Sequence, residues 1–364
     1  MGLTAGIVGL PNVGKSTLFN AITKQNILAA NYPFATIEPN VGTVIVPDKR
    51  VSVLEDMYNP NRTIPTTFEF TDIAGLVKGA SLGEGLGNKF LSHIREVDAV
   101  VEVVRCFDDR NIIHVDGSID PIRDIEVINV ELILSDLEIV DNRISKIYKK
   151  ATTSKNKDDL KELELLNRIK GSLEKNKAIR ELEFNDDEIK LLKSFNFITM
   201  KPIIYVANVD EESLLNGGNM YVDKVREYAN FDNVVMICAK VESELSELEE
   251  EEKKEFLQEL GVSESGLATL IKSTYKLLGL STFFTVGSDE VRAWTFKNGM
   301  KAPNCAGIIH TDFEKGFIRA EVISYTDLIN CGNEIKVKEA GKVRLEGKDY
   351  IMQDGDICHF RFNV

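Results

Sequence analysis

The sequence lacks several features that mark whole classes of protein. It has no apolar run of the ~18 residues that a membrane-spanning helix requires, so we expect no membrane partner. Its first ten residues show no basic segment followed by a long apolar stretch, which argues against a secretory signal. The five cysteines are scattered and form no Cys-x-x-Cys pair. We therefore expect reduced thiols in a cytoplasmic protein.

Positive charge is also scarce. The 44 Lys and Arg residues face 58 Asp and Glu residues, a formal net charge of −14. This balance argues against a protein whose whole surface binds nucleic acid through phosphates. The excess is uneven, however, because residues 201–280 alone hold 8 basic and 16 acidic residues, around the run Glu249–Glu252. We interpret that run as a solvated helix face or loop, so the total charge does not exclude a local basic surface elsewhere.

The composition is that of an ordinary globular protein. Hydrophobic residues make up 43% and charged residues 28% of the 364 positions. At roughly 150 residues per domain, this length predicts two or three domains. A chain of this size can bury a core without disulfide or metal support.

The first part of the chain alternates strand and helix signals. A helix is expected from Lys15 to Thr23, directly after a short buried strand. Strands separated by helices are typical of a doubly wound, mainly parallel α/β domain. The predicted strands span residues 5–10, 41–46, 67–71, 99–104, 202–208 and 234–238.

A helical segment interrupts this pattern. From Val130 to about Ser194 the chain contains no proline. Apolar residues recur at steps of three and four on both sides of a polar stretch at 151–159, which predicts two helices packed as an antiparallel hairpin. With about two heptads visible per helix, the spacing leaves open whether the pair is supercoiled. The apolar positions are Ile133, Leu137, Val140, Ile144 and Ile147, then Leu163, Leu166, Ile169 and Leu173.

The last part of the chain shows a different sequence pattern. Short strand signals alternate with glycine-bearing turns, which indicates a small, mainly β domain. The expected strands span residues 281–286, 305–309, 317–323, 349–352 and 357–362. The predicted domains are a nucleotide-binding domain at 1–130 and 201–280, a helical insertion at 131–200, and a β domain at 281–364.

One motif predicts a phosphate site. Residues 9–16, Gly-Leu-Pro-Asn-Val-Gly-Lys-Ser, match G-x-x-x-x-G-K-[ST] between a buried strand and a helix. The glycines let the backbone approach phosphates, whose charge the amide N–H groups and the helix N-terminus stabilise. Lys15 would contact the β- and γ-phosphates, and the Ser16 hydroxyl would bind Mg²⁺.

Two further segments complete a triphosphate site. Asp72 ends a strand and is placed to hold Mg²⁺ through water, while the Gly75 N–H can meet the γ-phosphate. The glycine-rich stretch at 78–88 should become ordered when a γ-phosphate binds, as in a switch. Thr36, between the first helix and the second strand, is the remaining candidate Mg²⁺ ligand.

These motifs together carry a family resemblance. Residues 9–16, 32–42 and 72–80 resemble those of the Obg-related P-loop NTPases, most closely the YchF subfamily. The resemblance covers nearly the whole chain. It implies a P-loop domain, an inserted helical hairpin or coiled coil, and a C-terminal TGS-like β-grasp domain, for which residues 291–296 and 352–356 are the telling segments. It also implies ribosome association in translation or stress response.

The motif that reads the base favours adenine. GTPases of this class use Asn-Lys-x-Asp, in which the aspartate accepts two guanine N–H groups. This chain has Asn208-Val209-Asp210-Glu211, so the acid is one methylene too long and the lysine is missing. Misplacing a polar partner costs orders of magnitude in discrimination. YchF proteins with Asn-x-x-Glu prefer ATP. A shift of one residue could still present Asp210 to guanine.

The predicted site can be stated in full. The nucleotide-binding residues are Asn12, Val13, Gly14, Lys15, Ser16, Thr17, Gly75, Asn208, Val209, Glu211, Cys238, Ala239 and Lys240. The last three resemble the Ser-Ala-Lys loop that contacts the base through its backbone. The metal ligands are Ser16, Thr36 and Asp72. Lys15 and His114 are the catalytic candidates.

The group that orients the attacking water has several candidates. Ras-like enzymes place a glutamine directly after Asp-x-x-Gly, where this chain has Leu76. His114, in a loop beyond a sheet strand, is our first candidate, and His93 is a weaker one. A group supplied by a partner, or K⁺ held by Asn12, are the alternatives.

A basic tip is expected on the hairpin. Its members are Arg143, Lys146, Lys149, Lys150, Lys155 and Lys157. A solvated helix end explains them, and a contact with RNA phosphates is the sharper hypothesis. The TGS-like domain is the second surface that could meet RNA.

The sequence thus predicts a monomeric, ribosome-associated, Mg²⁺-dependent ATPase acting as a nucleotide switch, with GTP as a weaker substrate. One alternative is an ATP-gated binding module without a catalytic role, which Leu76 favours. A second is a GTPase of the same fold. A small-molecule kinase is a third, against which stands the lack of a recognisable arginine-bearing lid.

Overall fold

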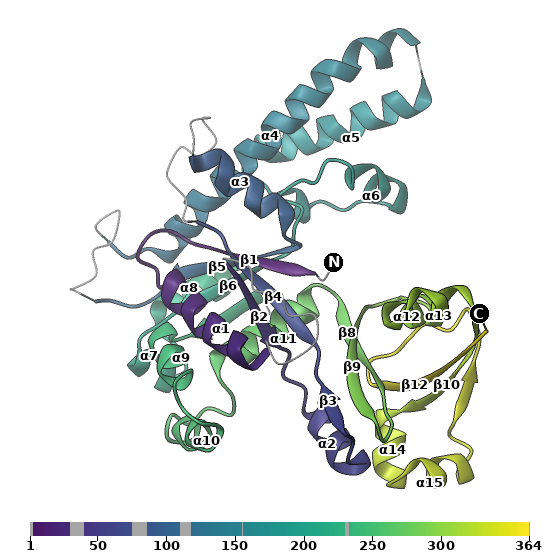
Figure 1. The fold of residues 1–364 in the computed structure, drawn as a ribbon. Helices are drawn as coiled ribbons and strands as arrows, with labels where there is room; N and C mark the ends of the chain where they lie inside the picture. Colours follow the sequence, from purple (N-terminus) through teal and green to yellow (C-terminus); the bar gives the residue numbers. More distant parts are fainter. Residues whose placement is uncertain are drawn as a thin grey trace. The chain divides into compact units, whose positions relative to one another are not determined.

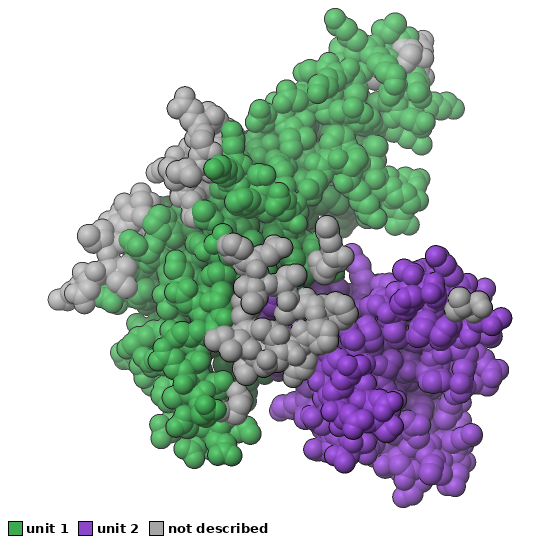
Figure 2. All heavy atoms as spheres, in the orientation of Figure 1, with its two compact units in different colours: residues 1–26, 37–42, 69–270 green, residues 27–36, 43–68, 271–364 purple. Residues whose placement is uncertain are grey.

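The computed structural model describes residues 3–29, 40–74, 86–109, 118–154, 156–229 and 233–363. The chain divides into two compact units (Figure 2). Unit 1 contains residues 1–26, 37–42 and 69–270, and unit 2 contains residues 27–36, 43–68 and 271–364. Within the described ranges, none of the helices combines the length and apolar character that crossing a bilayer requires.

A six-stranded sheet lies at the centre of unit 1 (Figure 1). Its order is β2-β4-β1-β5-β6-β7, and the pairs β1–β4, β1–β5, β5–β6 and β6–β7 are parallel. β5 and β6 are buried along their whole length, as expected for β-branched strands covered on both faces. This architecture confirms the doubly wound fold. The strands are β1 Thr4–Val8, β2 Val41–Ile45, β4 Thr67–Asp72, β5 Ala99–Arg105, β6 Ile203–Asn208 and β7 Val234–Ile237.

Helices connect these strands, as in other α/β domains. α1 follows β1 and begins at Lys15, where the phosphate-binding motif ends. The connecting helices are α1 Lys15–Ala29, α3 Leu86–Glu96, α7 Glu211–Leu215, α8 Met220–Ala229, α9 Ala239–Leu245, α10 Glu250–Glu259 and α11 Gly266–Leu277.

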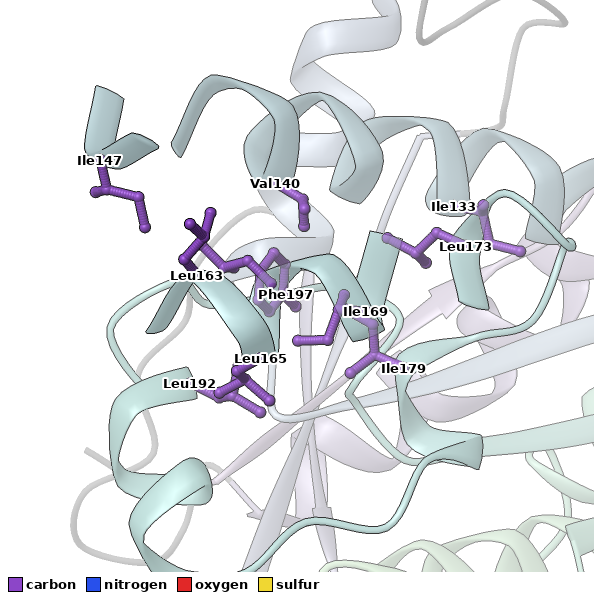
Figure 3. Packing of buried hydrophobic residues seen from close by; sticks show 11 residues of the cluster. Ile133, Val140, Ile147, Leu163, Leu165, Ile169, Leu173, Ile179, Leu192 and Phe197 are labelled. Carbon is purple, nitrogen blue, oxygen red and sulfur yellow. The ribbon is translucent and has the colours of Figure 1, made fainter. Parts of the chain in front are cut away.

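The predicted helical hairpin is present between β5 and β6. It consists of α4 Pro121–Ser154 and α5 Lys157–Leu173, which lie side by side (Figure 1). Its predicted apolar positions form one cluster with side chains from the return segment (Figure 3). α4 begins ten residues before the predicted boundary at 131, because Asp120 accepts hydrogen bonds from the first backbone N–H groups. The polar stretch predicted as a loop is mostly helical.

The return segment from the hairpin to β6 is anchored from α4. It contains η2 Ile179–Glu181 and α6 Asp186–Leu192. The carboxylate of Asp136, which is completely buried, accepts hydrogen bonds from the backbone N–H groups of Ile198 (3.1 Å) and Thr199 (2.7 Å). The Thr199 hydroxyl donates a third, at 2.8 Å. The base of the hairpin is therefore fixed to the strand that re-enters the sheet.

Unit 2 is built on a second six-stranded sheet. Its order is β11-β10-β12-β8-β9-β3, with β3–β9 and β12–β8 parallel and the other described pairs antiparallel. α12 and α13 pack with one hydrophobic cluster and α2, α14 and α15 with another. The strands are β3 Arg62–Ile64, β8 Leu280–Thr285, β9 Glu290–Lys297, β10 Phe317–Ser324, β11 Arg344–Glu346 and β12 Asp356–Phe362. The helices are α2 Lys49–Tyr58, α12 Ala302–Ile309, α13 Thr311–Lys315, α14 Tyr325–Cys331 and α15 Glu334–Glu339.

Two predicted strands of this region are wrong. Residues 305–309 belong to helix α12, which has proline in its first turn, a position that favours helix initiation. Residues 349–352 contribute only one isolated bridge, between Ile351 and Lys301. The predicted division also placed residues 43–68 with the nucleotide-binding domain, whereas the structure groups them with residues 271–364.

Candidate nucleotide-binding site

The phosphate-binding motif forms the turn between β1 and α1. Asn12 and Gly14 adopt positive φ angles of 64° and 95°. A Cβ atom at Gly14 would lie 2.1 Å from the Asn208 amide nitrogen, and one at Gly9 would lie 2.8 Å from the Val103 carbonyl oxygen. Gly9 is therefore required by the close approach of the β5 backbone, and Gly14 by its positive φ angle and the close approach of the Asn208 side chain. The side chains of Ser16 and Thr17 are exposed in the first turn of α1.

Asn208, at the end of β6, fixes this turn in place. Its amide nitrogen donates to the Val13 carbonyl at 2.8 Å, and its amide oxygen accepts from the Ala239 N–H at 3.0 Å. The side chain is buried, so both bonds are shielded from water. The residue predicted to contact the base thus joins the phosphate loop to the loop that precedes α9.

A cavity of about 850 Å³ opens beside this junction. Its volume lies within the range typical of ligand pockets. The cavity brings together most of the residues predicted to bind the nucleotide: Asn12, Gly14, Thr17, Asn208, Val209, Glu211, Cys238, Ala239 and Lys240. Its other walls come from Phe107, Asp109, Asp210, Glu212 and Leu215.

Besides Glu212 and Leu215, the sequence reasoning missed two residues that line this cavity, Phe107 and Asp109. They follow β5 at the carboxyl edge of the parallel strands, where ligands of α/β sheets bind, and that rule could have found them. The buried Arg105 guanidinium lies 4.7 Å from the centre of the Phe107 ring. It also donates hydrogen bonds to the carbonyl oxygens of Phe107 (3.1 Å) and Asp109 (3.2 Å). Arg105 therefore holds this wall of the cavity.

The base-reading segment has a defined geometry. Val209 is buried, and its N–H donates to the Ile237 carbonyl at 2.8 Å. Asp210 caps α7: one of its carboxylate oxygens accepts from the Ser213 N–H at 2.8 Å. Glu211, the first residue of α7, is exposed. The carboxylate that a one-residue shift could have presented to guanine is therefore engaged by the helix.

The segment from Cys238 to Lys240 forms the opposite side of the cavity. Cys238 is buried at the N-terminus of α9, and burial raises the pKa of its thiol. A thiol in this environment is a poor nucleophile, which favours a structural role. Lys240 is exposed, and its ammonium nitrogen lies 3.9 Å from a carboxylate oxygen of Glu244 on the next turn of α9.

The phosphate end of the site contains an ion pair. The Lys15 ammonium contacts the carboxylate of Asp72, with side chains that are 11% and 22% exposed. Asp72 reaches this position because β4 pairs with β1 in a register that sets it opposite Ile7. Within the described residues no cluster of three His, Cys, Asp or Glu side chains could hold a metal alone. The Asp72 carboxylate and the hydroxyl of Ser16, the residue after Lys15, are still a donor set that fits Mg²⁺, which usually takes few protein ligands and binds through phosphates and water.

Three predicted site residues lie outside the described part of the chain. They are Thr36, Gly75 and His114, so the γ-phosphate contacts and the water-orienting group stay predictions. Leu76 also lies outside it. The alternative water-orienting residue, His93, lies exposed on α3.

The chain is similar to known proteins along its whole length. A family model described as 50S ribosome-binding GTPase matches residues 4–143, and the C-terminal model of YchF GTPases, described as a protein of unknown function, matches residues 280–363. The chain is 61% identical to the ribosome-binding ATPase YchF of Bacillus subtilis and 57% identical to that of Haemophilus ducreyi, with 100% of each chain covered.

Solved structures point the same way. The Schizosaccharomyces pombe YchF GTPase superposes with a TM-score of 0.90 at 41% identity, covering 99% of this chain and 98% of the other. A GTP-binding protein from Pyrococcus horikoshii, 22% identical, shares the fold with a TM-score of 0.61, covering 99% and 100%. The identity over the full length establishes the relationship: this chain belongs to the YchF family of Obg-related P-loop NTPases.

Proposed function

We propose that this chain is a Mg²⁺-dependent ATPase that acts as a nucleotide-controlled switch on the ribosome. The observation that carries the proposal is the cavity beside the phosphate loop, into which the predicted base-binding residues converge. The relatives from Bacillus subtilis and Haemophilus ducreyi bear the name ribosome-binding ATPase, which supports the same activity and partner here.

ATP is the proposed substrate, with GTP weaker. Guanine recognition needs a carboxylate that accepts two N–H groups at once. Asp210 is held by the Ser213 N–H, and the longer Glu211 starts a helix from an exposed position. Val209 is apolar and buried, so it offers a surface to an adenine ring without a polar partner for the guanine edge. A site without that acceptor loses several orders of magnitude in guanine selectivity.

Titration of the full chain with ADP and GDP side by side tests this preference. We expect ADP to bind at least about tenfold tighter, a difference of about 1.4 kcal/mol. The double variant Val209→Lys with Glu211→Asp should lower or reverse the ratio of ADP affinity to GDP affinity. GDP or GTP binding tighter than ADP or ATP in the unmodified chain would contradict the proposal.

The phosphate chemistry follows from the same geometry. Lys15 would exchange its contact with Asp72 for the β- and γ-phosphates, and Asp72 with Ser16 would hold the metal. Mg²⁺ supplies charge neutralisation of the triphosphate when bound. Thr36 and the Gly75 N–H would complete the site around the γ-phosphate.

Hydrolysis is proposed to be slow without a partner. Leu76 stands where related enzymes carry a glutamine, so His114 is proposed to orient the water, with K⁺ near Asn12 as a further candidate. Ribosomes that raise the hydrolysis rate severalfold would support a catalytic cycle. An unchanged rate would favour the alternative, an ATP-gated binding module. Replacing K⁺ by Na⁺ in the same assay tests the K⁺ dependence.

The proposed partner surfaces are the hairpin tip and the C-terminal β domain. The tip is less basic than the sequence suggested, because Arg143 pairs with Glu162 at 2.6 Å and Lys150 with Asp159 at 3.1 Å. Lys146 and Lys157 are exposed on the same tip and are the proposed contacts to RNA phosphates. We further propose that the protein is a cytoplasmic monomer. Light scattering of the purified chain tests its oligomeric state.

A further inference from the structure

Residues 43–68 occupy an unusual place in the chain. In the sequence they lie between Thr36 and the pair Asp72 and Gly75, the positions proposed to respond to the γ-phosphate. In the structure they belong to unit 2, together with residues 271–364 (Figure 2). The boundary between the units thus falls inside β2 and again inside β4, and the elements between these strands, α2 and β3, belong to unit 2.

The helix of this segment is part of the unit 2 core. Leu54 of α2 is completely buried in a cluster with Phe284, Val291 and Ile357. Val51, Met57 and Tyr58 of the same helix pack against that cluster. Because protein cores are close-packed, a helix buried in this way moves together with the sheet that it covers.

Polar contacts reinforce this packing. Arg50 forms a two-pronged ion pair with Asp354, at 2.8 and 3.2 Å, and its guanidinium lies 5.1 Å from the centre of the Phe284 ring. Such paired contacts fix orientation as well as distance. At the other end of α2, the Tyr58 hydroxyl donates to the Glu334 carboxylate of α15 at 2.6 Å.

The strand of the segment extends the unit 2 sheet. β3 pairs with β9 in parallel, with Arg62 opposite Glu290 and Ile64 opposite Arg292. The Thr66 hydroxyl is hydrogen-bonded to the Thr295 hydroxyl of β9. Backbone pairing, core packing and ion pairs therefore tie residues 50–66 of this segment to unit 2.

We propose that residues 43–68 are the conformational link through which the bound nucleotide controls the C-terminal β domain. The inference rests on the proposed nucleotide switch. A segment joined at both ends to γ-phosphate-responsive positions receives any shift of β2 or β4, and a close-packed unit passes such shifts on as a whole. By thermodynamic reciprocity, contacts inside unit 2 must then influence nucleotide affinity.

Hydrogen–deuterium exchange of the full chain tests the link. Exchange is compared with ADP and with a non-hydrolysable ATP analogue, each with Mg²⁺. We expect peptides of β9 and α15 to differ between the two nucleotides, although the proposed site contains no residue from either element. Protection of the peptide 9–24 by both nucleotides serves as the internal control for binding.

The outcomes separate the two proposals. If the peptide 9–24 is protected while unit 2 exchanges identically with both nucleotides, the link is refuted and the ATPase proposal stands. If neither nucleotide protects the peptide 9–24, both proposals fail.

A pair of variants tests reciprocity. Arg50→Ala with Tyr58→Phe removes the two polar anchors, whereas Tyr325→Phe removes a hydroxyl from α14 in the same unit. We expect the double variant to change the ATP-analogue-to-ADP affinity ratio severalfold, toward the roughly 5- to 150-fold range of allosteric coupling. The control should leave the ratio unchanged. A ratio unaffected by the double variant, with native exchange elsewhere, would overturn the link.

Discussion

At the scale of single residues, the site depends on side chains that hold backbone loops. Asn208 joins the phosphate loop to the segment before α9, and Arg105 holds the wall formed by Phe107. The sequence motif predicted that Asn208 belongs to the site. Its structural contacts could not be predicted, because Val13 and Ala239 are 195 and 31 residues away in the chain.

Removing the Asn208 side chain should weaken nucleotide binding more than any contact with the base would explain. In Asn208→Ala the Val13 carbonyl and the Ala239 N–H both lose their partner. Each lost bond costs about 1 kcal/mol, and more if the group stays buried. We expect ADP affinity to fall at least about tenfold, equivalent to about 1.4 kcal/mol, with a lower urea midpoint. Asn216→Ala, at the exposed C-terminus of α7, should change neither measurement.

Glu102 offers a second test at this scale. It lies fully buried in β5, and neither carboxylate oxygen has a hydrogen-bond partner among the residues that the structure describes. Burial raises the pKa of Glu102 well above its usual range, with Arg180 opposing and Asp124 adding to the shift. The folded protein therefore keeps this proton to a higher pH than the unfolded chain does.

The sign of the pH effect follows from that difference. As pH rises above the ordinary glutamate pKa, the unfolded chain releases the proton first, so the free energy of unfolding falls by up to about 1.4 kcal/mol per pH unit. The loss ends at the raised pKa of the folded state. Glu102→Gln removes this dependence, so its stability advantage over the unmodified chain should grow from pH 5 to pH 8 in urea unfolding. The exposed Glu138→Gln should show no such trend.

At the scale of elements, hydrophobic spacing predicted the helical hairpin. The contacts that fix the base of the hairpin became known only from the structure. The apolar steps of three and four in residues 133–173 are local, so they could be read directly (Figure 3). The hydrogen bonds that Asp136 accepts from residues 198 and 199 span more than 60 positions and follow no local pattern. Short apolar runs do not distinguish a strand from a buried helix, because they are too short to show a periodicity. Residues 305–309, predicted as a strand, are such a run.

The anchoring predicts the effect of losing Asp136. In Asp136→Ala three buried donors are left without their acceptor, at a cost of about 3 kcal/mol or more. We expect faster hydrogen exchange at residues 196–200 and a lower melting temperature. Asp141→Ala, which removes a half-exposed ion pair with Lys170, should cost less than about 1 kcal/mol. Equal effects of the two variants would show that the anchor contributes little.

At the scale of the whole molecule, charge is distributed unevenly along the chain. Residues 201–280 carry a net charge of −8, more than half of the total of −14, whereas the hairpin segment 131–200 carries 14 basic and 14 acidic residues. This distribution was visible in the sequence. The assignment of residues 43–68 to unit 2 could not be read from the sequence, because β3 pairs with a strand more than 220 positions away.

The tip charges predict how a ribosomal partner would respond. Lys146→Glu with Lys157→Glu should lower cosedimentation with ribosomes and reduce its dependence on salt, since each phosphate contact releases counterions. Arg143→Gln, whose partner is Glu162 on the same hairpin, should lower it less. Unchanged cosedimentation in the double variant would exclude the tip as the contact.

The contact between Lys15 and Asp72 has a consequence for the order of ligand binding. The lysine proposed to hold phosphate and the carboxylate proposed to hold Mg²⁺ neutralise each other. If free Mg²⁺ bound alone, the Lys15 ammonium would lose its counter-charge. If nucleotide bound alone, the Asp72 carboxylate would remain unpaired beside the phosphates. A Mg²⁺–nucleotide chelate replaces both halves of the pair together. Metal and nucleotide should therefore enter this site as one ligand, each making the other's binding stronger.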